Sequence, residues 1–286
     1  MTGRKRRMTP LTDGKPGVTS GFFRVPFEFP GNWREIHFAP RRRRGTGDAY
    51  AEDPMIKANC RDRFTAADFE FVVKTLSKSE RDSVNLVDLL TDAEARDSIL
   101  DSPRLVESVL ENGGTLTISP QLYFYVLIRH VLKQTGLSDR RVCDYLASLL
   151  ETFSQTARMK SPADGQSNPV QYVSDMLIAL RGASAEQTFL IRAHVGNYSL
   201  FITGMFHETV QSRSQRGAPD MGFYEEIGRS NFKAAAAHRV ARSCELTPVY
   251  ERLADGFHEA RLALNRLSDT LLHLDDAHGA GNSFLA

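Results

Sequence analysis

Cysteine is scarce in this chain, and the patterns that bind metals or form disulfide frameworks are missing. The 286 residues include only Cys60, Cys143 and Cys244, and no CxxC pair occurs. An odd number of widely spaced cysteines argues against a disulfide framework and against a zinc knuckle. We therefore expect reduced, mostly buried thiols in a cytoplasmic protein.

Long apolar runs are also missing. No stretch of 18 or more apolar residues occurs, and the N-terminus lacks the apolar core of a secretion signal. Hydrophobic residues make up 41% of the chain and charged residues 25%, as is ordinary for a globular protein. These features predict a cytoplasmic protein without a membrane partner.

Sequence motifs of well-known enzymes are absent as well. The chain has no GxSxG, no HExxH, neither common glycine-rich phosphate loop, and no CxxCH for haem attachment. No cysteine stands in a context that predicts activation as a nucleophile. We therefore favour a protein that is not an enzyme, and we predict no metal site.

Charge is distributed unevenly along the chain. Residues 1–50 hold eleven basic and four acidic residues, a net charge of +7, whereas the remainder holds 25 basic and 31 acidic residues, a net charge of −6. Residues 1–54 are rich in Pro, Gly and Arg without sustained periodicity, so we expect a disordered basic arm. One alternative is that this stretch is an upstream extension before a natural start at Met55. Another is nucleic-acid binding, for which the candidates are Arg4, Lys5, Arg6, Arg7, Arg41, Arg42, Arg43 and Arg44.

From Met55 onward the pattern is helical, with at most one short strand at 115–118. Apolar residues recur at helical spacing, for example Val84, Val87 and Leu90, and typical capping residues stand where helices begin. We expect an all-α multi-helix bundle that forms a single domain over 55–277, with a polar loop near 158–168 and a frayed tail at 278–286. The predicted helices are 65–76, 79–90, 92–100, 102–110, 119–135, 138–156 (capped by Ser138), 169–180, 184–210, 220–243 and 247–274.

The helices at 184–210 and 220–243 carry glycine, asparagine and histidine on faces where aliphatic side chains are usual. Gly196 and Gly204 each cost about 1 kcal/mol relative to alanine inside a helix. Close approach of another helix is the usual compensation, and a ligand held against the backbone is the rarer one. Asn197 should face inward, and it needs partners because an unsatisfied buried amide costs about 1–3 kcal/mol.

Two interpretations of this helix pair follow. The first is a buried structural network that joins His194 and Asn197 to a neighbouring helix. The second is a pocket for a small ligand or cofactor, with haem bound through His194 as a minor form and no other cofactor predicted. The residues of that pocket would be His194, Asn197, Tyr198, Phe201, Tyr224, Arg229 and Asn231.

The runs HVGNYSLFITGMF and FYEEIGRSNF resemble an uncharacterised family of bacterial all-helical proteins, over residues of about 55–275. Where the family pattern has an acid and a tyrosine, this chain has Asn197 and Phe232. The resemblance implies a soluble bacterial helical protein and adds no chemistry. The matching positions are His194, Val195, Gly196, Leu200, Phe201, Gly204, Phe206, Tyr224, Gly228 and Arg229.

The last predicted helix has apolar residues spaced alternately three and four apart. This heptad seam should pack inside a bundle, either its own or one shared with a second subunit, because few charges flank it. We therefore predict a non-enzymatic homodimer that acts as a regulatory or scaffolding component, with a further protein partner as an extension of this hypothesis. The seam residues are Tyr250, Leu253, Phe257, Ala260, Leu264, Leu267, Leu271 and Leu274.

Overall fold

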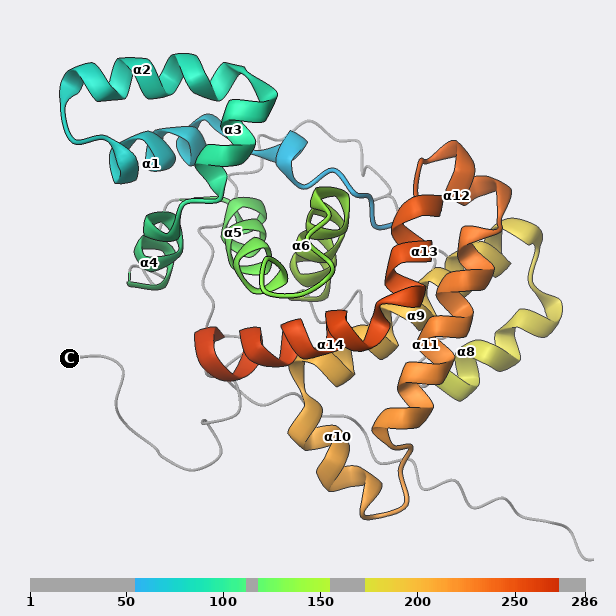
Figure 1. The fold of residues 1–286 in the computed structure, drawn as a ribbon. Coiled ribbons are helices and arrows are strands. Elements are labelled where there is room, and N and C mark those ends of the chain that lie inside the picture. The colour runs from blue at the N-terminus through green and yellow to red at the C-terminus, as the bar shows by residue number, and fades with distance from the viewer. Residues whose placement is uncertain (1–54, 112–117, 155–172, 273–286) are drawn as a thin grey trace, which may run out of the picture.

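The computed structural model describes residues 55–111, 118–154 and 173–272, and every regular element within these ranges is helical (Figure 1). This confirms the all-α, multi-helix prediction. The helices are η2 (Arg61–Arg63), α1 (Ala66–Leu76), α2 (Glu80–Thr91), α3 (Ala93–Leu100), α4 (Pro103–Glu111), α5 (Pro120–Leu132), α6 (Arg140–Ser154), α8 (Val173–Ala179), η3 (Leu180–Gly182), α9 (Ala185–Met205), α10 (His207–Ser214), α11 (Met221–Ala236), α12 (Arg239–Ser243), α13 (Thr247–Asp255), α14 (Phe257–Arg266) and η4 (Leu267–Leu272).

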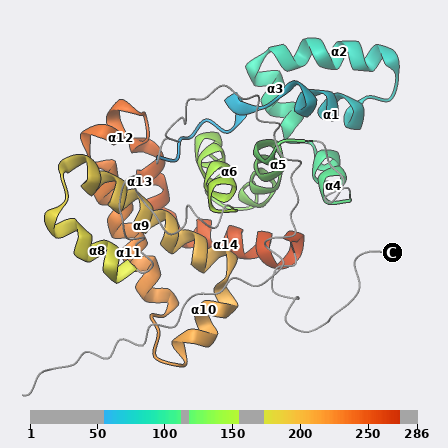
Figure 2. The same ribbon diagram turned by 180° about the vertical axis from the view of Figure 1, so that it is seen from behind.

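Helices α5 and α6 lie side by side at the centre of the molecule, and α14 crosses beneath both of them (Figure 1 and Figure 2). Helices α1 to α4 lie to one side of this centre. Helices α8, α9 and α11 to α13 lie to the other side. Helix α10 extends away from the bundle below α14.

Local capping residues set the starts of the N-terminal helices. Thr65 and Asp68 form a capping box for α1, in which the Thr65 side chain accepts from the backbone N–H of Asp68. Ser79 and Asp92 cap α2 and α3, and Pro103 is the first residue of α4. All four predicted helices of this region are therefore confirmed.

Helix α5 is buried all round, as its uniformly apolar sequence predicts. Its residues from Gln121 to Arg129 are all buried, and so are Val142 to Leu150 of α6. The start of α6 corrects the prediction by one residue. Asp139, rather than Ser138, accepts from the first free N–H groups of this helix, those of Arg141 and Val142.

Close helix packing accounts for the glycines of α9 and α11. A Cβ atom at Gly196 would lie 2.7 Å from two ring carbons of Phe232 on α11. A Cβ atom at Gly228 would lie 2.5 Å from Cζ of Phe257 on α14. The glycines therefore leave the space that aromatic rings of neighbouring helices occupy, as the more usual interpretation of these residues predicted.

Three long helices of the sequence analysis are shorter in the structure. The helix predicted at 184–210 ends at Met205, and α10 begins after Phe206. The helix predicted at 220–243 is interrupted between α11 and α12, where His238 accepts from the N–H of Val240 as the cap of α12. The helix predicted at 247–274 is broken at Gly256, where a Cβ atom would lie 2.6 Å from Cδ2 of Leu137.

Six of the eight seam residues are buried within the chain itself, Leu267 among them, whereas Leu271 is partly buried and Leu274 lies outside the described residues. Tyr250 and Leu253 of α13 are fully covered, as are Phe257, Ala260 and Leu264 of α14. The structure thus favours the first of the two arrangements predicted for the seam, a bundle formed within one chain.

Several predictions fall on residues outside the described ranges. These are the basic arm at 1–54, the polar loop near 158–168, the tail at 278–286, residues 115–117 of the predicted strand, and residues 155–156, 169–172 and 273–274 of three predicted helices. Ile118, the last residue of that strand, is not in a strand. None of the described helices combines the length and the apolar character needed to cross a membrane.

Candidate functional site

His194 lies in the middle of α9, packed between aromatic rings. Its imidazole is 5.7 Å from the ring of Phe153 on α6 and is stacked on Tyr198 at 6.4 Å, measured between ring centroids. Phe201, one turn further along α9, contacts the same Phe153 ring edge-on at 5.1 Å. The structure thus places His194 and Phe201 against one phenylalanine of a neighbouring helix, with Tyr198 stacked on His194.

Asn197 faces the same neighbouring helix and is only 4% exposed. Its Oδ1 accepts a 2.8 Å hydrogen bond from the hydroxyl of Tyr145, which is fully buried on α6. Burial raises the pKa of Tyr145 well above its usual range, so the phenol stays protonated and remains a donor. This is the bond between α9 and a neighbouring helix that the structural interpretation of Asn197 requires.

The remaining predicted pocket residues lie along α11. Asn231 is buried, its Nδ2 donates to the carbonyl of Ile227, and its Oδ1 accepts from Arg192 of α9 at 3.3 Å. Arg229 is exposed and donates from Nε to the carbonyl of Ala254. Tyr224 lies half-buried beside Phe223, with ring centroids 5.4 Å apart. These three side chains contact different neighbours: Arg192 of α9 for Asn231, Ala254 of α13 for Arg229, and Phe223 for Tyr224.

Metal and cofactor binding were tested against the same geometry. Among the described residues, no group of three or more His, Cys, Asp or Glu side chains is arranged to hold a metal ion. A histidine that binds haem needs open space beside its ring for the porphyrin. Phe153 and Tyr198 pack against the imidazole of His194 instead. A groove of about 440 Å³ is present elsewhere, lined by Leu137, Pro248, Glu251, Arg252, Asp255 and Gly256, and it contains none of the predicted pocket residues.

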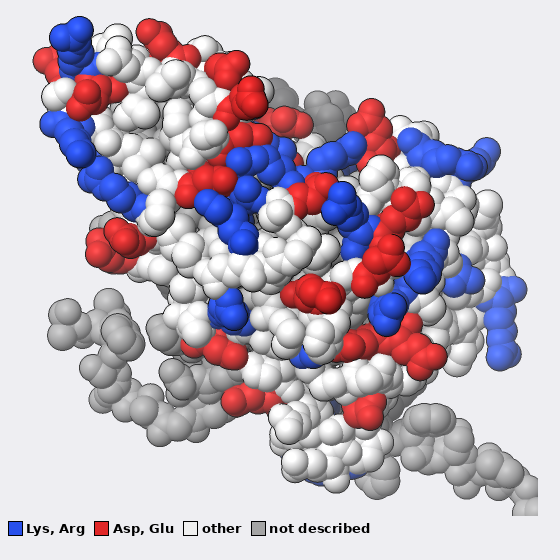
Figure 3. Space-filling view, in the orientation of Figure 1, with Lys and Arg blue, Asp and Glu red and all other residues white. Residues whose placement is uncertain are grey.

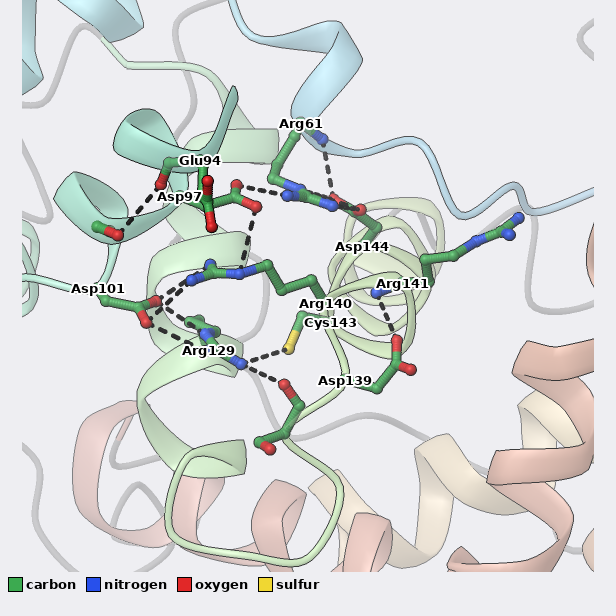
Figure 4. A network of polar contacts seen from close by, with 12 residues as sticks. Arg61, Glu94, Asp97, Asp101, Arg129, Asp139, Arg140, Arg141, Cys143 and Asp144 are labelled. Carbon is green, nitrogen blue, oxygen red and sulfur yellow. Dashed lines mark hydrogen bonds and ion pairs between the residues drawn. The ribbon is translucent and has the colours of Figure 1, made fainter. Parts of the chain in front are cut away.

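Figure 4 shows a cluster of charged side chains that the sequence analysis did not predict. Arg61, just before α1, donates to Asp144 of α6 from both its backbone N and its guanidinium, and also to Asp97 of α3. Arg129 of α5 and Arg140 of α6 both donate to Asp101 at the end of α3. These bonds therefore connect η2 and α3 to the central helices α5 and α6.

Three arginines face three aspartates in this cluster, Lys133 lies 3.6 Å from Asp101 as a further cation, and burial shifts the pKa values of several members. Burial raises the pKa of Asp144 despite its bonds to Arg61. Burial also opposes the charge of Arg61, but its bonds to Asp144 and Asp97 outweigh this effect and raise its pKa. Cys143, whose Sγ is 3.9 Å from Arg129, has its pKa raised by burial to about 11, so it remains a thiol at neutral pH.

No signal in the sequence identified these residues together. The three arginines and three aspartates come from four elements: Arg61 from η2, Arg129 from α5, Arg140 and Asp144 from α6, and Asp97 and Asp101 from α3 and its C-terminal end. Ion pairs between distant elements have no periodicity to reveal them, unlike an apolar helix face. The predicted nucleic-acid residues, Arg4 to Arg7 and Arg41 to Arg44, lie outside the described residues.

Comparison of the chain with protein-family models, with curated proteins and with solved structures gives no match in any of the three. The resemblance to an uncharacterised bacterial helical family therefore remains a prediction from the quoted runs. What can be said of this chain's function comes from its own residues.

Proposed function

We propose that this chain is a non-enzymatic, homodimeric scaffolding or regulatory component of the bacterial cytoplasm. One observation favours this proposal over a ligand pocket between α9 and α11. The space and the hydrogen-bonding groups at the predicted pocket are used by the chain's own side chains, namely the ring of Phe232 at Gly196 and the hydroxyl of Tyr145 at Asn197. Filled space and satisfied polar groups are typical of a structural core.

The location in the cytoplasm is supported by the state of the thiols. All three cysteines are free, and Cys60 and Cys143 are buried. Free cysteines at buried positions are usual in reducing compartments.

A scaffold needs a surface for its partner, and the heptad seam is covered by the chain itself. Exposed large apolar side chains remain on other helices, among them Val84 and Val87 of α2, Ile178 of α8 and Leu262 of α14. Exposed apolar side chains on adjacent turns are more typical of an interaction surface than scattered ones. Among the exposed large apolar side chains of the described residues, only those of α2, Val84, Val87 and Leu89, share a helix.

Native mass spectrometry of the full-length chain, purified under gentle conditions, tests the proposal. The expected result is a mass of two chains with no small molecule attached. A single chain that carries a non-protein mass released on denaturation would overturn the proposal in favour of a ligand-binding protein. Bound nucleic acid whose affinity falls steeply with salt would overturn it in favour of the basic arm.

A further inference from the structure

Helix α2 carries an apolar stripe that faces away from the rest of the chain. The sequence analysis grouped Val84, Val87 and Leu90 on one face, but only Leu90 is buried. Val84 is 60% exposed and Val87 is 53% exposed. The packed side of α2 contacts α1 and α3, and the helix lies at the outer edge of the molecule (Figure 1 and Figure 2).

The exposed stripe follows a heptad pattern. Taking Val84 as position a and Val87 as position d, Glu80 is the preceding d residue and Thr91 is the next a residue. All four are exposed. The face therefore consists of two central valines with a polar residue at each end.

Charges of opposite sign flank this stripe on one edge. Arg81 and Asp88 are both exposed and lie seven residues apart, so they occupy successive e positions. Neither forms a described ion pair with another side chain. Figure 3 shows uncharged surface over α2 with acidic and basic side chains beside it.

This face is complementary to itself when two copies of α2 are antiparallel. Val84 then lies against the partner's Val87, and Thr91 lies against the partner's Glu80. In antiparallel helix pairs e positions face e positions, so Arg81 lies beside the partner's Asp88, and the twofold axis repeats the pair. Both ion pairs join opposite charges, and both valine contacts are apolar.

We propose that the exposed face of α2 binds the same face of a second copy of this chain, as an antiparallel, twofold-symmetric helix pair. This inference rests on the proposed function and names the surface through which the homodimer forms. Helix α2 is about 18 Å long at 1.5 Å per residue, so the contact is small and the dimer is expected to dissociate on dilution. The Arg61 and Arg140 bonds to Asp97 of α3 hold the neighbouring helix in place.

Charge reversal tests the pairing directly. In a dimer of the Arg81→Glu variant, the new carboxylate faces the partner's Asp88. In a dimer of the Asp88→Arg variant, the new guanidinium group faces the partner's Arg81. We expect each variant to weaken dimerisation at least about tenfold in sedimentation velocity over a range of concentrations. An equimolar mixture of the two variants should form a heterodimer, because every facing pair then has opposite charges again.

These substitutions do not weaken α2 itself. An acid near the start of a helix and a base near its end both interact favourably with the helix dipole, so loss of the dimer cannot be ascribed to loss of the helix. The matched control is Leu89→Lys, at an exposed position about 140° around the same helix from Val84. It should leave the dimer unchanged, whereas Val87→Lys should weaken it.

The outcomes separate this inference from the proposed function. A wild-type dimer that neither charge variant weakens, or variants that stay monomeric when mixed, would overturn the α2 pairing and leave the homodimer standing. A Leu89→Lys variant that dissociates as readily as Val87→Lys would also overturn the assignment of this face. A wild-type chain that is monomeric at every concentration would overturn both.

Discussion

The hydroxyl of Tyr145 on α6 donates a 2.8 Å hydrogen bond to Oδ1 of Asn197 on α9, and both side chains are buried. A neutral amide suits a neutral phenol donor, because neither group brings a charge into the core. The pair therefore acts as a polar connection between two central helices.

Removing the donor should destabilise the fold without changing its shape. Tyr145→Phe leaves Oδ1 of Asn197 buried without this partner, at an expected cost of about 1–3 kcal/mol in the free energy of unfolding. Urea denaturation followed by circular dichroism measures this difference. The comparison variant is Tyr250→Phe, which removes a buried hydroxyl that interacts with Tyr145 and leaves the bond from Tyr145 to Asn197 in place. It should lose less stability than Tyr145→Phe, and equal losses in both variants would contradict the assigned role of the bond to Asn197.

Replacing either of two glycines of α11 by alanine should change the stability of the chain, in opposite directions at the two positions. Gly228→Ala places a methyl group 2.5 Å from Cζ of Phe257, and the overpacking should cost about 1–3 kcal/mol. Gly222→Ala, at the exposed start of the helix, meets no atom nearer than 3.6 Å and should stabilise the chain by up to about 1 kcal/mol. Thermal denaturation of both variants tests this, and a stabilised Gly228→Ala would show that the ring of Phe257 can move aside.

Features that depend on neighbours in sequence could be predicted well. The capping boxes of Thr65 with Asp68 and of Ser184 with Gln187 are both present, because each involves residues only three positions apart. The break at Gly256 could not be predicted, because the heptad spacing of the apolar residues continues across it. The packing of Leu137 against Gly256 joins residues far apart in sequence and could not be predicted either. The apolar spacing of the last segment is therefore real, although the segment is not one continuous helix.

At the candidate site too, contacts between distant residues could not be predicted from the sequence. The inward orientation of Asn197 and the stacking of His194 on Tyr198 follow from helical spacing, and both are found. Their partners on α6, Tyr145 and Phe153, could not be identified because helical spacing does not say which helix lies opposite. For the same reason the exposed side of α2 could not be distinguished from its packed side.

The carboxylate of Asp101 should make stability depend on pH in the acid range. Burial alone would raise its pKa, but the bonds and charges of Arg129, Arg140 and Lys133 outweigh this and lower it below the usual 3.8. A lowered pKa in the folded state contributes stability above the unfolded-state value, and this contribution is lost as pH falls through the folded-state value. Asp101→Asn should therefore cost about 1.5–3 kcal/mol at pH 7, the usual worth of hydrogen bonds to charged groups.

The difference between wild type and Asp101→Asn should stay constant from pH 7 to about 5 and shrink below about 4. Urea denaturation at a series of pH values measures it. Glu259→Gln removes the same charge from an exposed position of α14 and serves as the control. A difference for Asp101→Asn that grows as pH falls would contradict the assigned pKa direction.

Helix α9 ends at Met205 without a capping glycine, and side chains from α14 and η4 occupy its C-terminus instead. Nδ2 of Asn265 donates at 2.8 Å to the carbonyls of both Thr203 and Gly204, and Oγ of Ser268 donates to that of Met205. Asn265→Asp keeps the shape of the side chain but turns this donor into an acceptor that faces two carbonyl oxygens. We expect a loss of about 1–3 kcal/mol at pH 7, because the two buried carbonyls lose their donor. Arg261 donates to Oδ1 of Asn265 at 2.9 Å and would pair with the new carboxylate, which limits the loss.

Acid should partly rescue this variant, because a protonated carboxyl can donate one hydrogen bond to the same carbonyls. Burial and the two carbonyl oxygens favour the protonated carboxyl, whereas Arg261 favours the charged form. We expect burial and the carbonyls to outweigh Arg261 and raise the folded-state pKa, so the penalty is smallest below the unfolded-state pKa and grows as pH rises through the folded-state value. Hydrogen exchange at the end of α9 should show faster opening at pH 7 than in wild type. Asn85→Asp, the same change at an exposed position of α2, should show neither effect, and a similar loss there would mean that added charge alone destabilises the chain.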